Sequence, residues 1–102
     1  MEIPEHVDRV LAVVESIPPG HVMSYGAVAE VVRDHGGVAT ARTVGTVMAR
    51  YGGAVAWHRV VNAAGRLPPG HERQARAALT EEGVPFRGAH VDMRAAAWYP
   101  ES

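Results

Sequence analysis

Proline and glycine breaks divide the first half of the chain into three short segments, each with the apolar spacing of a helix. In the first segment, apolar residues from Val7 to Val14 repeat at i, i+3, i+4 and i+7, which predicts an amphipathic helix over residues 5–16. The sequence IPPG at residues 17–20 ends this helix, because proline cannot continue one. Short helices of this kind predict a mainly α fold, in which apolar faces are buried against one another.

Two further helices are predicted in the middle of the chain. Ser24 can N-cap a helix over residues 25–33, and Thr40 can cap another over residues 41–51. The sequence DHGG at residues 34–37 breaks the chain between them. Two short helices with a glycine-containing connection have the outline of a helix-turn-helix. Many all-helical domains share this outline, so from the pattern alone both DNA binding and a purely structural helix pair stay open.

The second half predicts short β elements and one strong helix. Residues 55–61 are rich in β-branched and aromatic side chains, which predicts a short buried strand or an extended core segment. Residues 71–82 carry apolar positions on one helical face, with Gly83 placed as the C-cap. The tail from Val84 onward has no clear period. The predicted fold is a mainly α, small winged-helix-like domain with a helix-turn-helix and short β elements.

Composition limits the function classes. A chain of 102 residues with 47% hydrophobic and 21% charged residues predicts one globular domain over residues 1–102. It has no apolar stretch near 18 residues, and residues 1–6 lack the features of an export signal, so we expect a cytoplasmic protein without membrane contact. Zero cysteines exclude disulfides and thiolate ligands, and no two of the six histidines have the i, i+3 or i+4 spacing of a helical ligand pair. We therefore expect neither a metal nor a cofactor.

Charge distribution is more informative than the net charge of −1. All ten basic residues are arginine, and acidic residues crowd the start of the chain. The arginines around the middle of the chain include Arg33, Arg42, Arg50 and Arg59. A locally basic face on a near-neutral domain predicts modest, salt-sensitive phosphate contact, although a simple solvated surface fits the charges equally well.

Four blocks of the sequence resemble, in the same order, those of the O6-alkylguanine-DNA alkyltransferases. They are IPPGHVMSYG at residues 17–26, ARTVG at 41–45, WHRVVN at 57–62 and EEGV at 81–84. Trp57 stands at the position of that family's reactive cysteine. In this respect the sequence resembles the alkyltransferase-like proteins, a subgroup that keeps the fold and lesion pocket without the cysteine. Indole has no thiol or hydroxyl for a base to activate. We therefore expect no alkyl transfer, no catalytic residue and no enzyme activity.

The resemblance implies a set of DNA-binding residues on the helix-turn-helix. In the family, its second helix enters the minor groove and the damaged nucleotide rotates out of the duplex, with an arginine filling the gap and a tyrosine pushing on the adjacent phosphate. The matching positions here are Ser24, Tyr25, Ala41, Arg42, Thr43 and Gly45. Small side chains four residues apart would leave a helix face that a narrow groove accepts. An exposed helical Arg42, a core Tyr25 and a capping Ser24 are the structural alternatives.

The resemblance also implies a lesion pocket. Its expected residues are Tyr25, Val55, Trp57 and Arg73. An aromatic wall at Trp57 would favour an alkylated O6 edge through burial of about 0.8 kcal/mol per methylene. Arg73 is the expected match for an arginine that stacks on the flipped base in related proteins. The alternative for Trp57 is a large buried aromatic that stabilises the core.

A relay of polar residues is implied behind the pocket, formed by His58, Arg59, Asn62 and Glu82. His58 and Glu82 match the pair that polarises the cysteine through a water in true alkyltransferases. Without a thiol, we expect them to persist as a buried polar pair that orients the segment around Trp57. We expect Arg59 to anchor the turn, and Asn62 to support it through backbone hydrogen bonds.

The resulting hypothesis is non-enzymatic recognition of DNA damage. The protein is expected to bind double-stranded DNA containing O6-alkylguanine in the minor groove, flip the damaged nucleotide into a pocket and direct the lesion to nucleotide excision repair proteins. We expect a monomer that is nucleoid-associated when bound to DNA. The alternatives are a lesion-processing enzyme such as a DNA glycosylase, using Glu82 or His58, and a winged-helix regulator that shares only the outline. Two departures from the family pattern, Ala56 for proline and Tyr51 for asparagine, lie near the reactive position.

Overall fold

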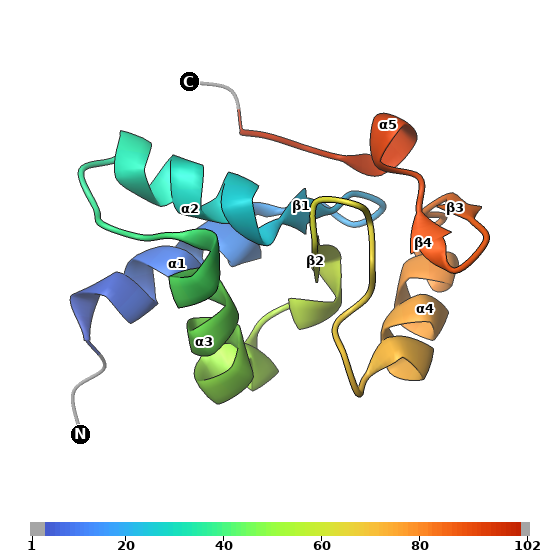
Figure 1. Ribbon diagram of the computed structural model, residues 1–102, viewed down its shortest axis with the longest axis horizontal. Coiled ribbons are helices and arrows are strands. Elements are labelled where there is room, and N and C mark those ends of the chain that lie inside the picture. The colour runs from blue at the N-terminus through green and yellow to red at the C-terminus, as the bar shows by residue number, and fades with distance from the viewer. Residues whose placement is uncertain (1–3, 101–102) are drawn as a thin grey trace.

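The computed structural model describes residues 4–100, so the predicted domain 1–102 extends outside the described part at both ends. Of the six N-terminal residues considered for an export signal, residues 1–3 lie outside it as well. Figure 1 shows three helices, α1, α2 and α3, on one side of the molecule and α4 with the C-terminal β elements on the other. Within residues 4–100, no helix has the length and apolar character needed to cross a membrane.

The three N-terminal helices pack into one core, as their apolar spacing predicts. Helix α1 spans Glu5–Ser16, α2 spans Tyr25–Asp34 and α3 spans Ala41–Tyr51. Each turns its valine stripe inward, and the buried residues include Val7, Val10, Val14, Val28, Val31, Val32, Val44 and Val47. The predicted helix-turn-helix is therefore confirmed as α2 and α3, whose inner faces share a core with α1.

Both predicted caps of the helix-turn-helix are confirmed. The Ser24 hydroxyl accepts a hydrogen bond from the Ala27 N–H at 3.0 Å, and the Thr40 hydroxyl accepts one from the Thr43 N–H at 3.2 Å. These bonds satisfy N–H groups that the first turn of a helix otherwise leaves without partners. The Arg33 guanidinium adds a bond of 2.6 Å to the Ala39 carbonyl, which fixes the connection between the two helices.

The prediction of a short buried strand or an extended core segment over residues 55–61 is wrong for most of that range. Two 3-10 turns, η1 (Gly52–Ala54) and η2 (Trp57–Arg59), precede a strand β2 of only Val60–Val61. This strand pairs in parallel with β1 (Met23–Ser24). Successive side chains of a strand point to opposite faces. The η2 turn instead lets the consecutive side chains of His58 and Arg59 reach the same carboxylate, that of Glu82.

The C-terminal part forms a second core around α4 (Glu72–Glu81), which is one residue shorter at each end than predicted. Gly83 follows the helix with a φ of +85°, in the left-handed region that a C-terminal glycine favours. The tail, which shows no period in the sequence, contains a hairpin of β3 (Phe86–Arg87) and β4 (His90–Val91) and the short helix α5 (Met93–Ala96). Strands of two residues are too short to produce a visible period.

The two cores are joined by the β1–β2 pair and by the C-terminal segment. The Trp98 N–H donates to the Val22 carbonyl at 2.8 Å, and the Tyr99 hydroxyl donates to the Asp34 carboxylate at 3.0 Å. Trp98 packs against the helical core, whereas Ala96 belongs to the second one. The end of the described chain therefore runs from one half of the fold to the other.

Candidate functional site

A cavity of about 550 Å³ lies between α3, the Trp57 segment (residues 55–59) and the loop that leads into α4. Its volume falls within the range of about 300–1,000 Å³ typical of pockets for small organic groups. Most of its wall is apolar, with a few hydrogen-bonding side chains. The lining residues are Tyr25, Gly45, Met48, Ala49, Gly52, Gly53, Trp57, Val60, Pro68, Pro69, His71 and Gln74.

Two of the four predicted pocket residues line this cavity. Tyr25 is the first residue of α2 and is half-buried, and burial raises the pKa of its hydroxyl above the ordinary value of 10.0. The hydroxyl is therefore protonated at neutral pH and able to donate a hydrogen bond. Trp57, at the start of η2, presents its indole to the cavity and packs against the second core.

The other two predicted pocket residues are not among those that line the cavity. Val55 packs against the helical core instead, and Arg73 lies exposed on α4. The residues that reach the cavity from this end of the chain are His71, which N-caps α4, and Gln74. The sequence carries no signal for them, because the start of α4 sets which of its side chains face the Trp57 segment.

Trp57 is held between two histidines. Its ring meets the His58 ring edge-on, with centroids 6.1 Å apart, and the His71 ring with centroids 5.6 Å apart at an interplanar angle of 65°. Edge contacts of this kind are favourable for aromatic rings and fix their orientation. The contact with His71 joins the Trp57 segment to the start of α4 across the cavity.

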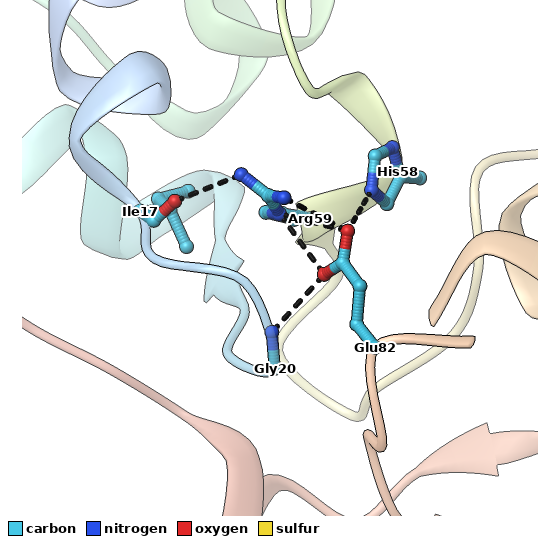
Figure 2. Close-up of polar contacts among 5 residues, drawn as sticks. All are labelled: Ile17, Gly20, His58, Arg59 and Glu82. Atoms are coloured by element: carbon cyan, nitrogen blue, oxygen red, sulfur yellow. Dashed lines mark hydrogen bonds and ion pairs between the residues drawn. The ribbon is translucent and has the colours of Figure 1, made fainter. Parts of the chain in front are cut away.

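The carboxylate of Glu82, at the C-terminal end of α4, gathers donors from two other segments (Figure 2). One oxygen accepts the His58 Nε2–H at 2.8 Å and the Arg59 Nη2–H at 2.8 Å. The other accepts the Arg59 Nε–H at 3.0 Å and the Gly20 N–H at 3.1 Å. Arg59 also donates to the Ile17 carbonyl at 3.1 Å. The Glu82 cluster, as we call Gly20, His58, Arg59 and Glu82, thereby ties the end of α1 to η2 and α4.

The Glu82 cluster differs from the predicted relay in two respects. The pair of His58 and Glu82 is present, but their side chains are 17% and 16% exposed, so the pair is only partly buried. In addition, Arg59 supplies an ion pair to Glu82, a contact that the sequence did not predict. The ion pair arises from the η2 turn, because this turn brings both His58 and Arg59 to one carboxylate.

Burial tends to raise the pKa of Glu82, yet hydrogen bonds from Arg59, His58 and Gly20 and the charge of Arg59 lower it to about 2 from an ordinary 4.5. Glu82 is thus ionised at neutral pH and can only accept hydrogen bonds. It follows that the His58 Nε2 atom carries a proton in this contact.

Asn62, the remaining member of the predicted relay, acts one turn further on. Its side-chain oxygen accepts hydrogen bonds from the Ala64 N–H at 2.9 Å and the Arg66 N–H at 2.8 Å. These bonds close the turn that follows β2 and do not reach the Trp57 segment. Gly65 in this turn has a φ of +86°, and a Cβ there would collide with the Val91 carbonyl, so the turn also locks against β4.

The predicted DNA-binding residues lie in the N-terminal parts of the two helices of the helix-turn-helix, Ser24 and Tyr25 at α2 and the other four on α3. Ala41 and Arg42 are exposed on the first turn of α3, and the Thr43 hydroxyl lies 3.0 Å from that of Thr40. Gly45, one turn later, has open space in front of it, since a Cβ there would meet no atom within 4 Å. Gly45 also lines the cavity, so α3 contributes both an open, low-profile face and a cavity wall. Within residues 4–100, no group of three or more potential ligands is placed to hold a metal ion.

Comparisons with known proteins agree with this geometry. Residues 5–84 match the family described as the 6-O-methylguanine DNA methyltransferase, DNA binding domain. An Escherichia coli K12 protein named DNA base-flipping protein is 40% identical over 96 residues, covering 88% of this chain and 71% of its own. The structure of S. pombe Atl1 in complex with damaged DNA containing O6-carboxymethylguanine has a TM-score of 0.75 at 30% identity and covers 98% of this chain and 100% of that one. M. tuberculosis O6-methylguanine methyltransferase, at a TM-score of 0.65 and 30% identity, covers 79% of this chain but 50% of its own.

Proposed function

This chain belongs to the family of the 6-O-methylguanine DNA methyltransferase DNA-binding domain, as an alkyltransferase-like member, and from that premise we propose that it recognises damaged DNA without an enzymatic step. The lesion we assign to it is O6-alkylguanine in double-stranded DNA. The protein approaches from the minor groove, rotates the damaged nucleotide out of the duplex and holds it in the cavity beside Trp57.

The observation that carries this proposal is the position of the cavity relative to α3. The first turn of α3 exposes Ala41 and Arg42, and the next turns place Gly45 and Met48 in the cavity wall. A helix docked in a groove through its first turn would therefore have the cavity beside it, within reach of a nucleotide rotated out of the stack. Arg42 is then positioned to fill the space that the nucleotide leaves, and Tyr25 to contact its phosphate.

The energetics favour an alkylated guanine over an unmodified one. Extruding a base costs a few kcal/mol, and less where the lesion already weakens pairing. In the largely apolar cavity, burying the alkyl group contributes about 0.8 kcal/mol per methylene. An unmodified O6 edge would instead lose its hydration, at a cost of about 1–3 kcal/mol without a new hydrogen bond. The cavity should therefore prefer the lesion, because burial of the alkyl group is favourable whereas desolvation of an unmodified O6 is unfavourable.

Two features support a role without chemistry on the base. The sequence has no cysteine, and the indole of Trp57 offers no nucleophile at the cavity. The groups that a glycosylase would need are committed elsewhere, because Glu82 is ionised and shared by His58, Arg59 and Gly20. We therefore propose that the bound lesion is passed on to nucleotide excision repair proteins, which would supply the chemistry that this chain lacks.

Fluorescence titration of matched duplexes tests the proposal. One duplex carries a single O6-methylguanine and the other carries guanine at the same position. We expect the lesion duplex to bind at least about tenfold more tightly, since the terms above differ by 1.4 kcal/mol or more. Equal affinities for the two duplexes would contradict the proposal. Release of a base or transfer of a labelled methyl group to the protein would contradict its non-enzymatic part.

A further inference from the structure

The start of α4 places two hydrogen-bonding side chains in the cavity wall that the proposed function does not use. His71 and Gln74 both line the cavity and are exposed. His71 is the N-cap residue of α4 and Gln74 lies in its first turn, so both side chains come from the same end of the helix. Among the described residues, neither side chain has a hydrogen-bond partner. Both are therefore available to a group that enters the cavity.

The position of His71 is fixed by contacts that leave its ring nitrogens free. Its backbone N–H donates to the Pro68 carbonyl at 3.1 Å, and its carbonyl accepts the Ala75 N–H at 3.0 Å. Its ring rests against the Trp57 ring, with centroids 5.6 Å apart. An imidazole carries at least one N–H donor in either protonation state, and a glutamine amide carries two. This corner of the cavity thus offers a donor on the His71 ring, which rests against Trp57, and two donors on Gln74.

Apart from the Tyr25 hydroxyl and the Trp57 indole N–H, the rest of the cavity wall contrasts with this corner. Along α3 and β2 the wall is formed by Met48, Ala49 and Val60, which offer no side-chain hydrogen bond. A substituent on a base held against Trp57 would therefore meet either an apolar wall or the donors at the start of α4. The two environments discriminate between apolar and hydrogen-bonding substituents of the same size.

We propose that His71, assisted by Gln74, selects lesions by the substituent on O6, and that groups ending in a carboxylate bind more tightly than apolar groups of the same shape. The inference rests on the proposed function, since it takes the flipped O6-alkylguanine to occupy the cavity. A carboxylate accepts hydrogen bonds only, so it pairs with the donors of His71 and Gln74. His71 is a specificity-determining residue in this scheme.

The surrounding charges are compatible with an anionic substituent. The acidic residues nearest in the chain, Glu72, Glu81 and Glu82, are not among those that line the cavity. Glu82 is moreover paired with Arg59. The N-terminal end of α4 faces the same region, and the partial positive charge of a helix N-terminus adds a favourable field for an anion. No carboxylate of the cavity wall opposes the proposed substituent.

The test compares two duplexes that differ only in the end of the substituent. One carries O6-carboxymethylguanine and the other O6-isobutylguanine, whose branched end has the shape of a carboxylate without its charge. The quantity measured is the ratio of the two dissociation constants. We expect wild-type protein to bind the carboxymethyl duplex more tightly than the isobutyl duplex. His71→Phe keeps a ring against Trp57 but has no N–H, so it should reduce this preference about tenfold, the usual value of a hydrogen bond to a charged group.

Two further variants separate selectivity from stability. His71→Gln keeps a donor and is expected to retain most of the ratio, and His6→Phe, at an exposed position on α1, is expected to leave it unchanged. A folding defect would weaken both duplexes and leave the ratio as it is. An unchanged ratio in His71→Phe, or no carboxymethyl preference in wild type, overturns the inference while lesion binding as such stands. If wild-type protein bound neither lesion duplex more tightly than the guanine duplex, that result would instead contradict the proposed function.

Discussion

Replacing Glu82 by glutamine should destabilise the fold by about 3 kcal/mol. In the variant, only one of the two side-chain acceptor oxygens remains, and the amide NH₂ that replaces the other cannot accept a hydrogen bond. At least two of the bonds from His58, Arg59 and Gly20 are therefore lost. The Arg59 side chain, only 16% exposed, keeps its charge without a carboxylate partner. A hydrogen bond to a charged group contributes about 1.5–3 kcal/mol, so two such losses cost about 3 kcal/mol at the lower end of that range, which suits partly exposed groups. For a domain of this size, the melting temperature should fall by about 12–24 °C.

Acid should remove the same contribution from the wild-type protein. Because the pKa of Glu82 is about 2 in the fold against an ordinary 4.5, the carboxylate stabilises the fold fully above pH 4.5 and loses this effect as the pH falls towards 2. Other carboxyl groups titrate in both proteins and cancel in the difference. The gap in unfolding free energy between wild type and Glu82→Gln should therefore be constant at neutral pH and narrow in acid. Urea unfolding at a series of pH values measures it.

Glu81→Gln is the matched control. Glu81 precedes Glu82, is exposed and forms no ion pair with another described residue, so its replacement should change stability by less than about 0.5 kcal/mol. The reasoning would be refuted if the unfolding free energies of Glu82→Gln and Glu81→Gln at neutral pH differed by less than about 1 kcal/mol, roughly the value of a single ordinary hydrogen bond. It is refuted equally if the gap stays constant down to pH 2.

Three predictions concern the proposed DNA-binding face and the cavity. Gly45→Ala should stabilise α3 by about 1 kcal/mol, because its Cβ meets no atom within 4 Å, yet weaken binding to the lesion duplex; unchanged binding would argue against docking through this face. Arg42→Ala should weaken lesion binding at least about tenfold, with its melting temperature close to wild type, and the exposed Arg50→Ala should have a smaller effect on binding; equal effects would leave Arg42 an ordinary phosphate contact. Trp57→Cys should place a thiol beside His58 and allow slow transfer of a labelled methyl group to the protein; the absence of transfer would show that the His58 relay cannot serve a thiol.

The helices were predictable because their signals are local. Ser24 and Thr40 lie at the caps that the structure contains, and the valine stripes face the core as their spacing predicts. The family was recognisable from four short blocks for the same reason, since each block is contiguous in the chain. The segment around Trp57 was predicted less well, because its η2 turn is held by a carboxylate from α4 far along the chain.

What the sequence by itself determined is which chemistry is present. It places an indole at position 57 and contains no cysteine, so a nucleophile at this site is absent whatever the fold. Only the tertiary structure decided which side chains surround that indole. Each residue of a helix rotates the side-chain direction by about 100°, so the start and packing of α4 put His71 and Gln74 in the cavity wall and leave Arg73 out of it. The contact between residues 57 and 71 has no local signal, because it arises where two separately formed segments pack together.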